Sequence, residues 1–357
     1  MDKALLFTSL VIFPFGQIAK LGPISFLDVT VFLIVVYTLL RKPKIPSWYI
    51  YLLSFILFGF FSWGINVFIL KSDLLVKGLM YGVRLLFYSM IPIFIYNFFK
   101  SQKDRKFIIN SLLSISIVTA VFGWIQYINW PNLVALKYLG WDDHLYRLVG
   151  TFLDPTFTSI ILVLGSIIAL KENRKLSLIF LGISILFTYS RVSYLIFILL
   201  LIYFKKYLIV FLFLISIFFL PKNMGGEGVN LVRTSSTNLK IINYKETLKI
   251  ITKSPVIGIG FNNLCPARQI YLNDTNITSH SCFGSDSSIL FILATTGIVG
   301  LFLFISFIFS IPSYPLLTIS FLIVLIHSTF ANSLFYPWVM YWIFILLGLG
   351  SKVNRKG

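Results

Sequence analysis

Five charged or ionisable residues of the sequence suit the transfer of a group away from a phosphate. Arg147, Arg191 and Lys240 are cations, while His280 and Asp286 can exchange protons. Cations stabilise the negative charge that develops on a departing phosphate. A carboxylate or an imidazole can take the proton from an attacking hydroxyl. Together these residues suit a pyrophosphate substrate with a nearby hydroxyl group to activate.

Each of these residues also has a simpler structural interpretation. An arginine at a membrane surface commonly anchors the chain to lipid phosphates, and this would suffice for Arg147 and Arg191. An aspartate at the start of a helix commonly caps it, and this would suffice for Asp286. Asp154 followed by Pro155 is typical of such a helix start. The functional interpretation depends on the fold, which must place the charged residues on one side of a membrane.

The elements that position these residues are membrane-spanning helices. Hydrophobic residues make up 58% of the 357 residues and charged residues only 12%, whereas a soluble domain carries about 25% charged residues. A chain this apolar needs lipid as its solvent. We therefore predict an all-α integral membrane protein that forms a single membrane domain over residues 1–357.

The apolar runs predict about twelve spans, with a range of 10–12. A span needs about 20 apolar residues, and the runs that approach this length are 4–19, 23–40, 48–70, 74–99, 107–128, 155–170, 176–189, 192–204, 207–220, 287–310, 315–331 and 334–350. The first run could pass for a signal peptide, but no small-residue cleavage site follows it. We therefore interpret it as a retained first helix.

The stretch 176–204 admits either one long tilted helix or two short helices that meet at Ser190 and Arg191. We predict the pair, because a tight turn at this point keeps every later loop on a consistent side of the membrane. The choice also decides on which side Arg191 lies.

The net charge of +18 is explained by basic residues in the loops that set the membrane topology. We therefore predict no nucleic-acid partner. Most basic residues fall in short clusters between the apolar runs, which is typical of cytoplasmic loops. These clusters are Arg41, Lys42 and Lys44; Lys100, Lys103, Arg105 and Lys106; Lys171, Arg174 and Lys175; Lys205 and Lys206; and Lys352, Arg355 and Lys356. Both termini are then cytoplasmic, and the segments 129–154 and 221–286 lie outside.

The segment 221–286 is a large outer loop, and loops of such length usually carry function. Ser235, Ser236 and Thr237 can cap a helix that runs to about Lys253. Its predicted apolar stripe consists of Ile241, Tyr244, Leu248 and Ile251, and its opposite face carries Lys245, Lys249 and Lys253. Lys240 falls on the apolar side, so an amphipathic helix that lies on the membrane body would aim Lys240 inward.

Both cysteines of the chain, Cys265 and Cys282, lie in this loop. An oxidising outer compartment permits a disulfide between them, and two free thiols are the alternative. The three histidines, His144, His280 and His327, are scattered and lack zinc-type spacing with cysteine. We predict no metal and no cofactor.

Arg84 lies ten residues inside the predicted span 74–99, about 15 Å from its nearer end. An arginine at mid-span costs about 2.5–3.5 kcal/mol on insertion scales, so it needs a partner or a polar cavity. Asp28 in the second span is a candidate partner. The alternative is that Arg84 lines a cavity for an anionic substrate.

At these positions the sequence resembles the bacterial O-antigen ligase and O-antigen polymerase (Wzy-type) superfamily. The resemblance covers most of the chain and is strongest from about residue 145 to about residue 350. Four motifs carry it: Arg147-x-x-Gly150-Thr-Phe-x-Asp154-Pro155; Thr188-Tyr-Ser-Arg191; Tyr244 followed by Lys253-Ser-Pro255-Val-Ile-Gly258-Ile-Gly260; and Asp286-Ser-Ser-Ile-Leu leading into Gly297-Ile-Val-Gly300. Their order and spacing are more specific than any one of them.

The resemblance implies a membrane glycosyltransferase of the bacterial cytoplasmic membrane. Such an enzyme transfers glycan from an undecaprenyl-pyrophosphate-linked oligosaccharide on the outer face, with inversion and without a metal. The expected pyrophosphate-binding residues are Arg191, Lys240, Arg147 and Arg84, and the expected structural residues are Asp154, Tyr244, Gly258 and Gly260. The expected partners are this lipid-linked glycan, the lipid bilayer and other polysaccharide-assembly proteins.

The sequence departs from the family pattern at three positions. Thr156 follows the Asp154-Pro155 pair where the family often has asparagine. Lys240 stands where the family commonly has arginine, so the charge is kept but the bidentate fork is lost. Asp286 stands where the family often has histidine, and His280 lies six residues earlier. We expect Asp286 to be the general base, with His280 as the alternative.

Three classes of function remain open at this point. The first is polymerisation of O-antigen, capsular or exopolysaccharide repeat units, with ligation of glycan to lipid A core or to protein as the alternative within the family. The second is a polysaccharide transporter or flippase, but the sequence lacks the internal repeat with paired broken helices that many transporters have. The third is a structural or sensory membrane subunit, which would not explain cations gathered on one face.

Overall fold

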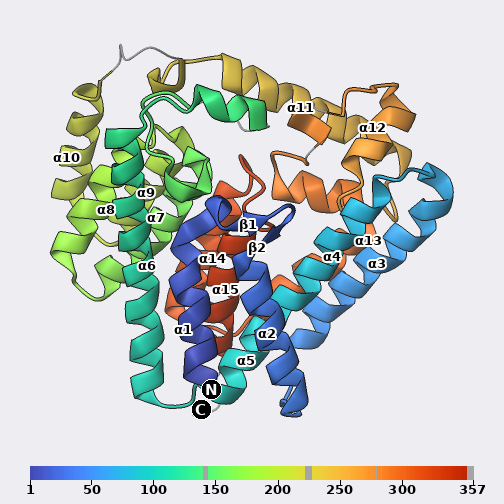
Figure 1. Cartoon of the computed structure of the whole chain (residues 1–357), viewed down its shortest axis with the longest axis horizontal. Helices are drawn as coiled ribbons and strands as arrows, with labels where there is room; N and C mark the ends of the chain where they lie inside the picture. Colours follow the sequence, from blue (N-terminus) through green and yellow to red (C-terminus); the bar gives the residue numbers. More distant parts are fainter. Residues whose placement is uncertain (140–143, 222–226, 278–279, 283, 352–357) are drawn as a thin grey trace. The chain divides into compact units, whose positions relative to one another are not determined.

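The computed structural model of the chain describes residues 1–139, 144–221, 227–277, 280–282 and 284–351 (Figure 1). The chain divides into two compact units whose segments interleave in the sequence. Unit 1 comprises Met1–Thr30, Lys100–Thr234 and Thr318–His327, and unit 2 comprises Val31–Phe99, Ser235–Leu317 and Ser328–Gly357. The single membrane domain over 1–357 stays a prediction.

Unit 1 is built around the helix α7 (Pro155–Lys171). All of its residues from 158 to 170 are buried, and it packs against three other helices. The described elements of unit 1 are α1 (Asp2–Ile12), η1 (Phe13–Ile18), β1 (Lys20–Leu21), β2 (Ile24–Ser25), α6 (Gln102–Asn129), η2 (Val134–Leu139), η3 (Gly150–Phe152), α7, α8 (Lys175–Phe187), α9 (Arg191–Tyr203), α10 (Tyr207–Phe218), η4 (Glu227–Val229) and most of α14 (Pro315–His327).

Unit 2 is built around α15 (Pro337–Gly350), which is buried from Trp338 to its end. The other described elements of unit 2 are most of α2 (Phe26–Leu40), α3 (Tyr49–Leu70), α4 (Leu75–Ser89), α5 (Ile91–Phe98), α11 (Ser235–Lys253), α12 (Leu264–Leu272), η5 (His280–Cys282) and α13 (Ser288–Ser310). A helix that is apolar on all sides, as α15 is, belongs in the core of a bundle.

The helices confirm that the chain is a multi-pass membrane protein. In the described part of the chain, four helical segments are long and apolar enough to cross a membrane, namely Tyr49–Leu70, Leu75–Phe98, Gln102–Asn129 and Ser288–Ser310. Shorter apolar helices of 10–17 residues account for most of the other predicted spans. The number of spans and the cytoplasmic location of the termini stay predictions.

Three predicted spans differ in detail from the observed helices. The run 4–19 is helical only to Ile12, because Pro14 and the positive φ of Gly16 (54°) turn the rest into a 3₁₀ segment. The run 23–40 begins with the second strand of a two-residue antiparallel hairpin, β1 with β2, within the predicted all-α fold. The run 74–99 is interrupted at Met90 between α4 and α5.

The stretch 176–204 forms two helices, which confirms the predicted pair. Helix α8 ends at Phe187 and α9 begins at Arg191, and Tyr189 between them has a φ of 51°. The two helices fold back on each other: a Cβ built on Gly182 of α8 would lie 3.3 Å from the Phe197 ring of α9. The Tyr194 hydroxyl also donates to the carbonyl of Leu186.

Helix α13 is interrupted at Gly297, which has φ 62° and ψ −166°. This interruption leaves backbone groups of α13 without partners in the helix, and the segment 255–260 supplies them. Ile259 N and Gly260 N donate to the carbonyls of Ala294 and Thr295 (both 2.9 Å), and Ile298 N donates to the carbonyl of Pro255 (2.9 Å). Part of the predicted outer loop is therefore packed into the helices of unit 2.

Two side chains of α3 complete this arrangement. Ser62 Oγ donates to the carbonyl of Ile257 (2.7 Å), and Asn66 Nδ2 donates to the carbonyl of Gly258 (3.0 Å). Irregular backbone among membrane helices is stable only when protein groups satisfy its N–H and C=O groups. Gly258 and Gly260 have positive φ values of 78° and 87°, so both fit the structural role predicted for them.

We expect Gly297→Ala to destabilise the protein strongly. The added Cβ would lie 2.2 Å from the Val256 carbonyl oxygen in a backbone conformation that L residues rarely adopt. Strain and overpacking together would cost roughly 2–5 kcal/mol. Thermal unfolding in detergent measures the loss. Gly64→Ala is the matched control, because a Cβ there meets no described atom within 4 Å; equal stability of the two variants would contradict the prediction.

Candidate functional site

Two buried or half-buried arginines of unit 1 converge on the break between α8 and α9. Arg147 Nε donates to the carbonyl of Thr188 (3.0 Å) and its Nη2 to the carbonyl of Tyr189 (3.4 Å). Arg233 Nη2 donates to the same Tyr189 carbonyl (3.3 Å). The last carbonyls of a helix have no partner within it and carry partial negative charge, so these cations stabilise the end of α8.

Arg191 occupies a different environment, at the first position of α9. Its Nη1 donates to the carbonyl of Arg233 (3.1 Å), and the residue is exposed. The start of a helix carries partial positive charge. An exposed guanidinium held at this point adds a full charge to it, which suits an anion such as a phosphate.

Arg147 is nearly enclosed, with 7% of its surface exposed. Burial, and after it the charge of Arg233, lowers the pKa of Arg147 to about 9, and Asp154 partly opposes this shift. Arg147 therefore remains a cation at pH 7. The Arg147 side chain is enclosed and donates to carbonyls at the end of α8. Arg147 therefore stabilises the break at 188–190.

Asp154 caps α7, as the sequence predicts. Its Oδ1 accepts hydrogen bonds from Thr156 N (2.6 Å) and Phe157 N (3.2 Å), and Pro155 takes the first helical position. The interpretation of Asp154 as a helix cap is confirmed.

Arg233 was missed by the sequence analysis. It lies in the predicted outer loop, directly before α11, and its Nη1 also donates to the carbonyls of Gly228 (2.8 Å) and Asn230 (2.9 Å). The sequence could have indicated a role for Arg233, because arginines are uncommon in the outer loops of a membrane protein.

Helix α11 begins at Ser235 and ends at Lys253, and the predicted bounds are confirmed. The predicted apolar stripe is wrong in part, because Ile241 and Leu248 are 44% and 49% exposed. The buried residues of α11 are Asn243, Thr247 and Ile250. Hydrogen bonds of Asn243 to the loop before α13, rather than apolar contacts alone, decide which face turns inward.

Two further side chains of α11 bind backbone after α14. Lys240 Nζ donates to the carbonyl of Phe330, and Tyr244 Oη donates to the carbonyl of Thr329 (2.8 Å). The inward orientation of Lys240 stays a prediction. An ammonium group has three donors, so this contact leaves Lys240 able to bind an anion as well.

Asp286 is hydrogen-bonded through its backbone N–H to Asn243 of α11 and is not a helix cap. The cap of α13 is Ser287, whose side chain accepts a hydrogen bond from Leu290 N. Burial, and after it the negative charge of nearby Asp286, raises the pKa of Tyr244 to about 12. The alternative interpretation of Asp286 as an N-cap is therefore wrong, because Ser287 occupies that position.

His280 begins the short 3₁₀ helix η5, which ends at Cys282. Cys282 forms a disulfide with Cys265 of α12. This disulfide ties the segment before Asp286 to α12. Helix α12 is the short helix that follows the packed segment 255–260.

We expect loss of the disulfide to lower stability by about 3 kcal/mol, because the bridge closes a loop with a sequence separation of 17 residues. Thermal unfolding of Cys282→Ser measures this loss. Reducing the wild type should give the same shift and should leave the variant unchanged. Alkylation of both thiols in the unreduced, denatured protein would contradict the prediction.

An ion triad around the buried Arg268, also missed by the sequence analysis, holds α11 to α12. Arg268 of α12, with 3% of its side chain exposed, binds the carboxylates of Glu246 and Asp274. A hydrogen bond from Asn276 N, together with Arg268, lowers the pKa of Asp274. Removing either carboxylate would leave the buried charge of Arg268 less compensated, so the triad acts as a scaffold for α11.

Arg84 lies on α4 and is half-buried, with its guanidinium 5.2 Å from the centre of the Tyr81 ring. Asp28 accepts hydrogen bonds from Ser25 N (2.8 Å) and Ser25 Oγ (2.9 Å) at the start of α2. The Arg84–Asp28 pair stays a prediction, as does the interpretation of Arg84 as a substrate-binding cation.

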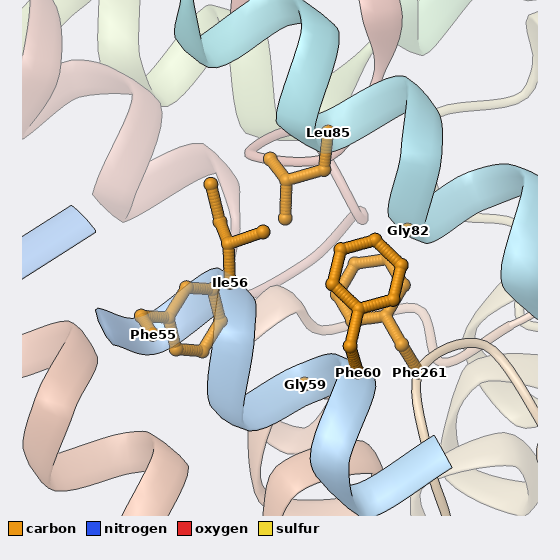
Figure 2. A pocket seen from close by; sticks show the side chains of 7 residues that line it. All are labelled: Phe55, Ile56, Gly59, Phe60, Gly82, Leu85 and Phe261. Atoms are coloured by element: carbon orange, nitrogen blue, oxygen red, sulfur yellow. The ribbon is translucent and has the colours of Figure 1, made fainter. Parts of the chain in front are cut away.

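A small apolar pocket of unit 2 is lined by side chains of α3 and α4 and by Phe261 (Figure 2). Its lining consists of Phe55, Ile56, Gly59, Phe60, Gly82, Leu85 and Phe261. None of the described residues that line it is charged, so the pocket suits hydrocarbon rather than a pyrophosphate. Among the described residues, no three His, Cys, Asp or Glu side chains are grouped so that they could hold a metal ion.

A comparison with known protein families matches residues 176–305 to the O-antigen ligase family. No curated protein matches the chain. The matched segment includes Arg191, Lys240, Tyr244, His280 and Asp286, whereas Arg84 and Arg147 lie before it.

Proposed function

We propose that this chain transfers glycan from an undecaprenyl-pyrophosphate-linked oligosaccharide. Residues 176–305 match the O-antigen ligase family, whose members transfer glycans from lipid-linked donors. The reaction takes place at the outer face of the bacterial cytoplasmic membrane. In this proposal both termini are cytoplasmic, and the break at 188–190 and helix α11 lie on the outer side.

The observation that carries this proposal is the position of Arg191. Its guanidinium is exposed at the start of α9, and backbone of the segment that holds Arg233 orients it. Arg147 and Arg233 brace the adjoining end of α8. We therefore assign Arg191 to the donor pyrophosphate and give Arg147 a positioning role. Lys240 and Arg84 are further candidate pyrophosphate contacts.

The proposed reaction is a single displacement at the anomeric carbon of the donor sugar. The hydroxyl of the acceptor forms the new glycosidic bond as the bond from the sugar to the pyrophosphate breaks. The proton of this hydroxyl passes to the Asp286 carboxylate, and undecaprenyl pyrophosphate leaves with the bonding electrons. One displacement inverts the configuration, and a cation that binds the pyrophosphate stabilises the charge on the leaving group. The reaction in this proposal uses no metal.

The transfer most consistent with the sequence features is polymerisation of O-antigen, capsular or exopolysaccharide repeat units. Ligation to lipid A core or to protein uses the same donor and is the alternative. The two differ in the acceptor, which is another lipid-linked glycan in polymerisation.

Deletion of the gene, followed by separation of surface polysaccharide on a silver-stained gel, tests the proposal. A polymerase defect gives products with a single repeat unit, and a ligase defect removes all glycan from the final acceptor. Unchanged polysaccharide would refute both forms of the proposal. Complementation with the wild-type chain is the control.

A further inference from the structure

Asn243 is a fully buried amide on the inner face of α11, with none of its surface exposed. Its Nδ2 donates to the carbonyl of Gly284 (2.9 Å), and its Oδ1 accepts from Asp286 N (2.9 Å). Both halves of the amide are thus used on one short loop. Burying an amide costs free energy unless it is hydrogen-bonded. The two hydrogen bonds of Asn243 are therefore strongly favoured.

The two hydrogen bonds flank Ser285 and fix the backbone on both sides of it. Gly284 has a φ of 147°, a value that L residues rarely adopt, so the loop has an unusual path at the point where Asn243 holds it. The path of this backbone sets the direction in which the Asp286 side chain leaves the chain.

The far side of the loop has its own attachments. Ser288 N donates to the carbonyl of Ser328 (2.8 Å), and Ser288 Oγ donates to Asn332 Oδ1 (2.9 Å). These bonds fix the start of α13. The backbone N–H of Asp286 itself donates to Asn243. Of these contacts, the one with Asn243 therefore acts most directly on the position of Asp286.

We propose that Asn243 is a positioning residue that holds Asp286 in the orientation needed to accept the proton of the acceptor hydroxyl. This inference rests on the proposed function, since it takes Asp286 as the general base. Asn243 acts through the backbone of Asp286 and does not itself contact the reacting atoms. A shift of about 1 Å in a catalytic group can cost about 100-fold in rate.

A double-mutant cycle in the full-length protein tests the inference. Asn243→Ala, Asp286→Asn and the double variant are assayed in detergent, with the donor lipid extracted from the deletion strain. We expect Asn243→Ala to lower kcat by about 10- to 100-fold with KM changed less than about 2-fold. In the Asp286→Asn background the same change should lower kcat less than about 3-fold, because coupled residues are not additive.

Thr247→Val is the matched control. Thr247 is buried on the same face of α11, one turn further along, and its hydroxyl donates only within the helix, to the carbonyl of Asn243. This variant should keep wild-type kcat. Rates are expressed per folded protein, with abundance and thermal unfolding measured for every variant.

The outcomes separate this inference from the proposed function. An equal loss of kcat from Asn243→Ala in both backgrounds, or no loss at all, would overturn the positioning role of Asn243. Full activity of Asp286→Asn would overturn the proposed role of Asp286 instead. If Asn243→Ala does not fold, Asn243→Leu takes its place in the cycle, because leucine has a similar shape and removes both hydrogen bonds without adding a charge.

Discussion

Replacement of Arg191 by alanine is expected to abolish glycan transfer while the abundance of the protein stays at the wild-type level. Removing one group that stabilises transition-state charge costs about 10²–10³-fold in kcat, or about 3–4 kcal/mol. The side chain is exposed, so its removal creates no cavity in the core. The measurement is polysaccharide chain length in cells that carry the variant, with immunoblotting for abundance.

Arg191→Lys and Arg174→Ala give this experiment its controls. Lysine keeps the charge but loses the planar fork, so partial activity is expected. Arg174 is exposed at the opposite end of α8, and its removal should leave activity unchanged. Wild-type activity in Arg191→Ala would return Arg191 to the simpler interpretation of a membrane-surface anchor.

Replacement of Asp286 by asparagine is expected to lower kcat by about 10²–10⁴-fold, the range typical of general acid–base catalysis. Asparagine has nearly the same shape and keeps the backbone N–H that Asn243 binds, but it cannot accept a proton. The measurement is the single-turnover rate of purified protein with extracted donor lipid, so that binding and product release do not mask the chemical step.

Two neighbouring residues test whether the effect belongs to Asp286. Ser287→Ala removes the cap of α13, which should cost about 1 kcal/mol of stability and leave the rate near the wild-type value. His280→Gln tests the alternative base. A large loss of rate in His280→Gln together with an active Asp286→Asn would transfer the role of base from Asp286 to His280.

The cationic group of unit 1 illustrates how far sequence reasoning extends. The sequence predicts Arg147 and Arg191 as candidate functional cations, and both lie at the same helix break in the structure. Their opposite environments could not be predicted. The carbonyls that Arg147 binds lie 41 and 42 residues away in the sequence. Arg233 binds a carbonyl 44 residues away, so no local pattern could show that these groups meet.

Helix α11 shows the limit of periodicity. The bounds from Ser235 to Lys253 were predictable, because the serine and threonine residues at its start and the Ser-Pro pair after its end are local signals. The buried face was not, since Asn243 and Thr247 are polar and an apolar stripe points elsewhere. The bond that decides the orientation joins residues 43 positions apart.

By itself, the sequence determined the membrane character of the protein, the approximate position of most helices and the two-helix hairpin at 176–204. Each of these depends on the length and polarity of runs of contiguous residues. The thickness of the lipid bilayer sets the length that an apolar run needs. Only the tertiary structure decided that Ser287 rather than Asp286 caps α13, that the segment 255–260 completes the hydrogen bonding of α13 at Gly297, and that Asn243 holds the loop of Asp286. These features depend on hydrogen bonds between groups far apart in the chain, and no local pattern encodes them.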